Sequence, residues 1–103
     1  MDKLAGALGL AKRAGQTVTG TELIQDAVRR KKAALVLAAS DASEGSVKKL
    51  KNTCLFYGVR FETIPYTKSE LSAALGMTRL TSAVSIRDHE ILKLINTVLC
   101  EKM

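Results

Sequence analysis

The sequence carries a continuous apolar run from Ala34 to Ala39, written ALVLAA, between the basic run Arg29 to Lys32 and the polar pair Ser40 and Asp41. This run is too short for a buried helix, and it lacks the polar alternation of a strand that faces water on one side. It therefore predicts a central strand covered on both faces. Such a strand needs other elements to cover it, so the flanking segments decide the fold class.

Helices are predicted on both sides of this strand from apolar spacing and from the residues at the helix ends. The predicted segments are Asp2 to Ala14, Thr19 to Arg30, Asp41 to Gly58, Thr67 to Gly76, and a last helix with its apolar stripe on Ile91, Leu94, Ile95, Val98 and Leu99. Capping boxes are predicted for the later four, on Thr19 with Glu22, Asp41 with Glu44, Thr67 with Glu70, and Ser85 with Asp88.

Three further strands are predicted between these helices. They cover Gln16 to Thr19, Val59 to Ile64, and the alternating residues Leu80, Ser82, Val84 and Ile86. Helices and strands alternate with short links, which favours a three-layer α/β/α sandwich around a small mixed four-stranded sheet. A chain of 103 residues has room for one such core, so residues 1–103 are expected to form a single domain.

Composition favours a cytoplasmic protein that meets a polyanion. The chain has 16 basic and 10 acidic residues, a formal net charge of +6. Cys54 and Cys100 stand alone in apolar helical patterns, which is typical of buried reduced thiols in a reducing cytosol. The first residues have an acid at Asp2 and only a short, interrupted apolar stretch, so neither secretion nor membrane insertion is expected.

Catalytic or cofactor chemistry is not predicted. His89 is the single histidine and has no evident triad partner. With two isolated cysteines, it does not make a four-ligand zinc set. The glycines near the start match neither a dinucleotide-binding nor a phosphate-loop motif after a strand, which leaves a small nucleotide-binding enzyme as a weak alternative. We therefore expect no catalytic residue, no metal and no cofactor.

Two local features suit RNA. The first is Lys12 to Glu22, where Lys12, Arg13 and small polar residues lead into a helix N-terminus with free backbone N–H donors. The alternative is that Thr19 and Glu22 merely cap each other. The second is the basic run Arg29 to Lys32, although such a run is more often a solvated helix end favoured by the helix dipole.

These segments resemble the ribosomal protein L7Ae/L30e family, and within it the small bacterial YlxQ-like branch. The resemblance covers nearly the whole chain. It rests on LGLAKRAGQTVTG near the start, on GTELIQDAVRRKKAALVLAASDAS, and on the late block ELSAALGMTRLTSAVSI. It implies a three-layer α/β/α fold that binds kink-turn RNA, a sharply bent internal loop with tandem sheared G·A pairs.

The resemblance also implies site residues. The glycine of the family's G-x-N-E-x-x-K motif falls on Gly20 and is followed by Thr21, while Glu22, Leu23 and Asp26 stand at the Asn, Glu and Lys positions. Basic contacts to RNA correspond to Arg30 and Lys68. The loop that covers the extruded nucleotide corresponds to Met77, Thr78, Arg79 and Leu80.

Three of these positions depart from the family motif. Leu23 has no acceptor for a guanine, Asp26 reverses the charge of the family's lysine, and Glu22 replaces a neutral amide. The resemblance therefore implies RNA binding without the usual reading of bases at these positions.

The hypothesis is a monomeric, non-catalytic protein that binds structured RNA, a kink-turn in ribosomal or another non-coding RNA. Its site would be the Gly20 end of the second helix, flanked by Lys12, Arg13, Arg30, Lys68 and Arg79. The alternative is a protein-interaction module that keeps the fold and has lost kink-turn binding.

Overall fold

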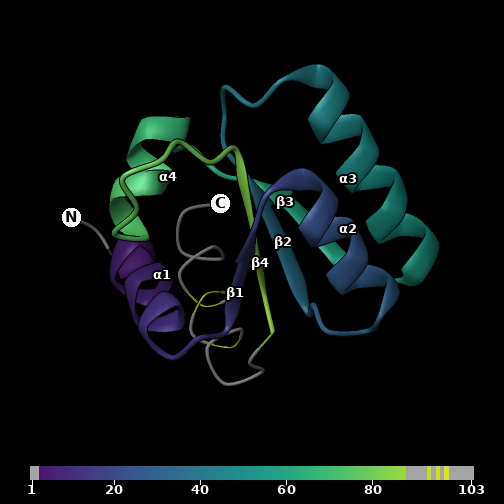
Figure 1. Ribbon diagram of the computed structural model, residues 1–103, viewed down its shortest axis with the longest axis horizontal. Coiled ribbons are helices and arrows are strands. Elements are labelled where there is room, and N and C mark those ends of the chain that lie inside the picture. Colours follow the sequence, from purple (N-terminus) through teal and green to yellow (C-terminus); the bar gives the residue numbers. More distant parts are fainter. Residues whose placement is uncertain (1–2, 88–92, 94, 96, 98–103) are drawn as a thin grey trace.

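The structure is a computed structural model that describes residues 3–87, 93, 95 and 97. In chain order, this part of the chain forms α1 (Lys3–Arg13), β1 (Thr17–Thr19), α2 (Thr21–Arg29), β2 (Leu35–Ala38), α3 (Glu44–Tyr57), β3 (Arg60–Thr63), α4 (Lys68–Ala74) and β4 (Ala83–Ile86) (Figure 1). Each of these elements lies within or close to the segment predicted from the sequence.

The four strands form one mixed sheet in the order β1-β4-β2-β3. Strand β4 is antiparallel to both of its neighbours, β1 and β2, whereas β2 and β3 are parallel. Leu35 is opposite Ile86 on one side and Arg60 on the other. The last strand of the described chain, β4, therefore lies inside the sheet, and the predicted mixed four-stranded sheet is confirmed.

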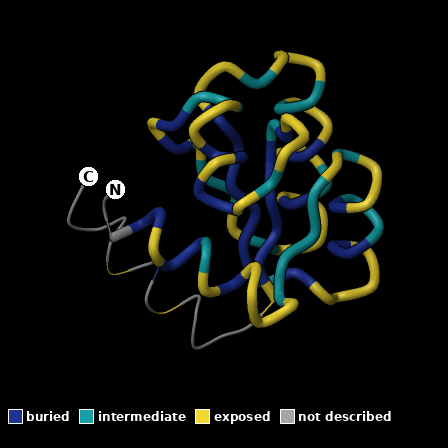
Figure 2. Tube along the Cα trace, turned by 60° about the vertical axis from the view of Figure 1, so that its left-hand side comes forward, coloured by how far each residue is buried: buried dark blue, intermediate teal, exposed yellow. Residues whose placement is uncertain are grey.

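Helices cover both faces of this sheet, with α1 and α4 on one side and α2 and α3 on the other (Figure 1). The side chains of β2 alternate between the two layers. Leu35 and Leu37 pack in a core cluster with α1 and α4, and Val36 packs in a second cluster with α2 and α3. Figure 2 shows this buried centre in dark blue. The predicted three-layer sandwich is confirmed.

Capping residues explain where two helices begin and end. The Thr67 hydroxyl accepts a hydrogen bond from the Glu70 N–H at 3.1 Å, and the Glu70 carboxylate accepts one from the Thr67 N–H at 3.0 Å, which confirms the predicted capping box of α4. Gly58 ends α3 with φ 70°, a left-handed conformation that glycine adopts without a side-chain clash.

The predicted cap of α3 is wrong. Ser43, and not Asp41, stands at the N-cap, where its hydroxyl accepts the Ser46 N–H at 3.2 Å. The Asp41 carboxylate instead accepts the Lys68 N–H at 2.7 Å, at the start of α4. The turn before α3 packs against the start of α4. The Asp41 carboxylate, which was expected to cap its own helix, therefore bonds to a residue distant in the sequence.

The predicted last strand is too long. Strand β4 begins at Ala83, all four of its residues are buried, and Leu80 lies before it with 69% of its surface exposed. A strand between two others, covered by helices on both faces, buries every side chain, so the alternation that suggested an earlier start does not describe it. Ser85 lies within β4 opposite Val18, and the predicted cap at this serine is also wrong.

The predicted last helix lies mostly outside the described residues, which exclude Asp88, His89, Ile91, Leu94, Val98, Leu99 and Cys100. Of its predicted apolar stripe, Ile95 is described, and it is fully buried in the core cluster that α1 and α4 form with the sheet. The expectation that Ile95 faces the core is confirmed.

We predict that truncating the central strand destabilises the protein far more than truncating its surface. Leu37→Ala removes a fully buried side chain between the layers and should lower the free energy of unfolding by about 3 kcal/mol. The same substitution at Leu55, which is 79% exposed, should change it by less than about 0.5 kcal/mol. Urea unfolding followed by circular dichroism measures both, and equal losses would contradict the burial of Leu37 in the core.

Candidate functional site

The N-terminus of α2 and the segment before β4 lie around one hollow of about 240 Å³, which we call the α2 N-terminal hollow. It is lined by Thr19, Gly20, Leu23, Met77, Arg79, Leu80 and Thr81. Five of these residues are predicted site residues from two segments far apart in the sequence. The fold therefore brings the predicted helix end and the predicted covering loop together.

Gly20 sets the start of α2. Its φ of 93° and ψ of 128° form a backbone conformation that side-chain-bearing residues rarely adopt, and its C=O accepts the Ile24 N–H at 2.9 Å. No side chain caps this helix end, so the predicted capping box of Thr19 with Glu22 is wrong. Thr19 is held in β1 opposite Val84, and the turn occurs at Gly20 instead. The first-turn N–H groups of α2 consequently have no side-chain cap.

Two buried polar side chains hold the loop on the other side of this hollow. The Ser72 hydroxyl accepts the Thr81 N–H at 2.9 Å, and the Ser72 C=O accepts the Met77 N–H at 2.9 Å. The Thr81 hydroxyl donates to the Ala83 C=O at 2.9 Å. Both ends of the loop are thus anchored to α4 and β4. Sequence reasoning missed Ser72 and Thr81, because nothing in their local pattern shows that they pair.

The walls of the hollow expose large apolar side chains beside a cation. Leu23 is 64% exposed and Leu80 is 69% exposed, while Met77 is half-buried against the core. The Arg79 side chain is also exposed and forms no ion pair within the described part of the chain. Exposed apolar groups next to an unpaired cation suit a ligand with flat apolar faces and negative charge.

A second hollow, also of about 240 Å³, continues along α2 from Leu23, and we call it the β1 hollow. It is lined by Gly15, Gln16, Thr17, Val18, Leu23, Asp26, Ala27, Arg30, Lys32 and Arg87. Within it the Arg30 guanidinium contacts the Asp26 carboxylate, with Nε and Oδ2 3.2 Å apart, and the two side chains are 66% and 49% exposed. The predicted site residue Arg30 is therefore partly neutralised by another predicted site residue.

A third hollow of about 350 Å³ lies at the other end of the same helix, and we call it the α2 C-terminal hollow. It shares Lys32 and Arg87 with the β1 hollow, just as the β1 hollow shares Leu23 with the α2 N-terminal hollow. The three hollows form one track along α2. The track carries five cations and one carboxylate, on Arg30, Lys31, Lys32, Arg79, Arg87 and Asp26. The net charge of the track is therefore strongly positive.

The remaining predicted site residues do not line these three hollows. Thr21 and Glu22 are in the first turn of α2, and Thr78 is exposed in the covering loop. Lys68 is half-buried at the start of α4. Lys12 and Arg13 are exposed at the end of α1, before β1 begins, whereas Gly20 follows the end of β1.

Three cations of the track were absent from the predicted site. Lys31 and Lys32 belong to the basic run that the sequence analysis noted, so charge clustering was the available signal. Nothing in the sequence around Arg87 indicated that it belongs to the site. It lines the track because β4 ends beside the turn that follows α2.

Catalytic groups are sparse in the described part of the chain. Among those residues no three of the His, Cys, Asp and Glu type come close enough to hold a metal ion. Cys54 is buried and free, and burial raises the pKa of its thiol to about 11. The thiol is therefore protonated at neutral pH, the unreactive form. No helix in the described part of the chain is long and apolar enough to cross a membrane.

The chain is similar in sequence to two proteins named RNA-binding protein YlxQ. It is 42% identical over 69 residues to the RNA-binding protein YlxQ of Bacillus subtilis (strain 168), covering 67% of this chain and 64% of that protein. It is 38% identical over 78 residues to the RNA-binding protein YlxQ of Enterococcus faecium, covering 75% and 74%. The chain thus aligns with just under two thirds of the length of the Bacillus subtilis protein.

Solved structures agree with this relationship. A protein of unknown function from Bacillus halodurans superposes with a TM-score of 0.83 and 29% identity, over 93% of this chain and 99% of that one. A 15.5kD RNA binding protein from Giardia lamblia has the same fold, with a TM-score of 0.76 and 22% identity over 95% and 86%. The family described as ribosomal protein L7Ae/L30e/S12e/Gadd45 matches residues 2–96. This chain belongs to the ribosomal protein L7Ae/L30e/S12e/Gadd45 family.

Proposed function

We propose that this protein binds structured RNA of the kink-turn type through the α2 N-terminal hollow and the positive track that continues from it. The observation that carries the proposal is the meeting of the uncapped N-terminus of α2 with the loop of Met77, Arg79 and Leu80 around one hollow. Two relatives named as RNA-binding proteins support it. The expected partner is ribosomal RNA or another non-coding RNA of the cytoplasm.

In this proposal, different residues along α2 contact the phosphates and the bases of the RNA. The free N–H groups at the helix start and the Arg79 guanidinium offer donors and positive charge to phosphate oxygens. Leu23 and Leu80 offer apolar surface on which the faces of bases can pack. Further along, Lys32 and Arg87 would meet the backbone of the same RNA.

The altered motif determines how this RNA is recognised. Leu23 cannot accept a hydrogen bond from a guanine, so recognition at this position would rest on apolar contact with a base or ribose. Asp26 would oppose phosphate instead of attracting it, and its ion pair reduces the positive charge that Arg30 presents. We therefore propose binding that depends more on RNA shape and charge than on hydrogen bonds to base edges.

The proposed activity is binding alone, by one chain acting as a monomer. The names of the two relatives describe binding and no reaction. We accordingly propose no catalysis and no cofactor.

The proposal predicts preferential and salt-dependent binding to a kink-turn. In fluorescence titrations, a labelled kink-turn duplex should bind more tightly than a duplex whose G·A pairs are disrupted. Each phosphate contact releases counterions, so the five cations of the track should give a log–log salt slope of up to about −4. Equal binding to both RNAs would indicate nonspecific charge attraction. No binding to either would favour the protein-interaction module.

Removing the cation of the covering loop should weaken RNA binding without unfolding the protein. Arg79 is exposed and lines the α2 N-terminal hollow, so Arg79→Ala should weaken kink-turn binding by roughly tenfold and leave the melting temperature within a degree or so of wild type. The matched control is Lys48→Ala, which removes an exposed cation of α3 that lines none of the three hollows. Equal weakening by both variants would move the site away from this loop.

Releasing Arg30 from its ion pair should strengthen RNA binding. Asp26→Asn removes the carboxylate that holds the Arg30 guanidinium, and Asp26→Lys also adds the charge found in the family motif. Affinity for a kink-turn should rise from wild type to Asp26→Asn to Asp26→Lys, most visibly at low salt. Thermal stability should fall only slightly, since exposed pairs of this spacing contribute about 0.5 kcal/mol. Three equal affinities would show that Asp26 does not face the RNA.

A further inference from the structure

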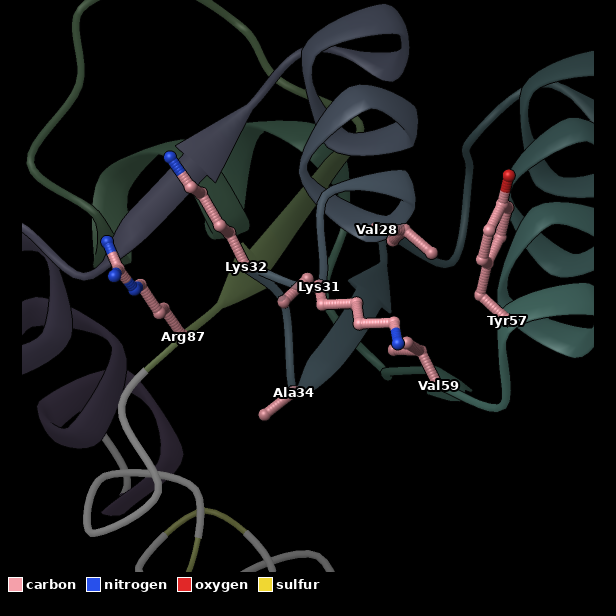
Figure 3. A pocket seen from close by; sticks show the side chains of 8 residues that line it. Val28, Lys31, Lys32, Ala34, Tyr57, Val59 and Arg87 are labelled. Atoms are coloured by element: carbon pink, nitrogen blue, oxygen red, sulfur yellow. The ribbon is translucent and has the colours of Figure 1, made fainter.

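The α2 C-terminal hollow is the largest of the three and lies at the end of the track away from Gly20. It forms where the turn after α2, the start of β2, the end of α3 and the end of β4 meet (Figure 3). Its lining consists of Val28, Lys31, Lys32, Ala33, Ala34, Tyr57, Val59 and Arg87. Three cations, one aromatic ring and four aliphatic side chains thus surround a space of about 350 Å³.

The cations of this hollow have no acidic partner among the residues that the structure describes. Lys31, Lys32 and Arg87 form no ion pair within the described part of the chain. In Figure 3 the Lys31 side chain extends across the hollow toward Val59, while Lys32 and Arg87 both extend away from Tyr57. Lys32 and Arg87 extend to the same side in Figure 3, so their charges repel each other, and a bound anion relieves that repulsion.

The backbone at Lys31 adds to this argument. Lys31 has φ 60°, the only positive value found for a residue other than glycine in the described chain. It follows α2 in the position where glycine is the usual residue, and a lysine there is strained by about 1 kcal/mol. The residue in this strained position places a cation at the hollow.

The opposite wall of the hollow is aromatic. Tyr57 is the last residue of α3 and is 41% exposed. Its ring meets that of Phe56 edge to face, with centroids 4.9 Å apart, which favours a defined orientation. Val59, half-buried beside it, supplies an aliphatic surface. A flat ring of a ligand can stack on such a wall.

We infer that the α2 C-terminal hollow binds an unpaired nucleotide of the RNA, with its base against Tyr57 and Val59 and its phosphate between Lys32 and Arg87. This inference rests on the proposed function and extends it to a second contact. Lys32 and Arg87 also line the β1 hollow, so a strand bound at the N-terminus of α2 reaches this site by following the track. The helix between the two ends has nine residues, about 14 Å, which a few nucleotides span.

The test compares a blunt kink-turn duplex with the same duplex carrying a short single-stranded extension at either its 5′ or its 3′ end. For the wild-type protein, one of the two extensions should tighten binding by roughly tenfold, the usual gain for stacking one base on an aromatic ring. With 4-thiouridine in that extension, photocrosslinking should attach the RNA to the peptide that contains Tyr57.

Paired variants separate the ring and the charge from effects on folding. Tyr57→Leu should lose the gain from the extension, and Tyr57→Phe should keep it, because phenylalanine retains the stacking surface. Lys31→Gly should reduce the gain while keeping the fold, since glycine adopts the left-handed conformation without strain. Lys48→Ala, outside the track, should leave it unchanged. Tyr57→Leu, Tyr57→Phe and Lys48→Ala should bind the blunt duplex as wild type does, whereas Lys31→Gly should bind it slightly more weakly because it removes one cation of the track.

Two outcomes overturn this inference in distinguishable ways. If the wild type binds the blunt duplex but gains nothing from either extension, or if Tyr57→Leu keeps the gain, the hollow does not take a nucleotide and the proposed function stands. If the wild type binds no kink-turn at all, the proposed function fails and this inference fails with it.

Discussion

The burial of β2 on both faces is the constraint on which the rest of the structure depends. Its four residues are completely shielded from solvent, with Leu35 and Leu37 in one core cluster and Val36 in the other. A strand of this kind requires helices on both sides, and it takes β4 as a neighbour because one of its edges would otherwise be left unpaired. The position of β4 in turn decides where the loop before it and Arg87 after it must lie.

The candidate site follows from this arrangement of β4. The loop before β4 reaches the N-terminus of α2 because β1, which leads into that helix, pairs with β4. Ser72 and Thr81 then fix the loop with hydrogen bonds that are shielded from water. At the other end of the strand, Arg87 comes beside Lys32. One strand thus positions residues at both ends of the track along α2, and the proposed RNA contacts depend on its register.

Positive charge is unevenly distributed along the track, which limits the kind of ligand that the track can bind. Asp26 partly neutralises Arg30 near the middle of α2, whereas Arg79 at one end and Lys31 with Lys32 at the other have no acidic partner in the described part of the chain. Positive charge is therefore concentrated at the two ends of the helix. A ligand held at both ends must be extended and polyanionic, which fits a strand of RNA better than a compact anion.

By itself, the sequence determined the layers of this fold, because apolar periodicity and turn residues are local properties that each segment carries alone. The family was indicated by the resemblance of three sequence blocks to its members. The sequence also marked Gly20, whose backbone conformation requires glycine, and the loop around Arg79. Only the tertiary structure decided that Asp41 bonds to the start of α4, that α2 begins without a side-chain cap, and that Arg87 joins the track. These features depend on contacts between segments distant in the chain, which strand order and register create and local spacing does not encode.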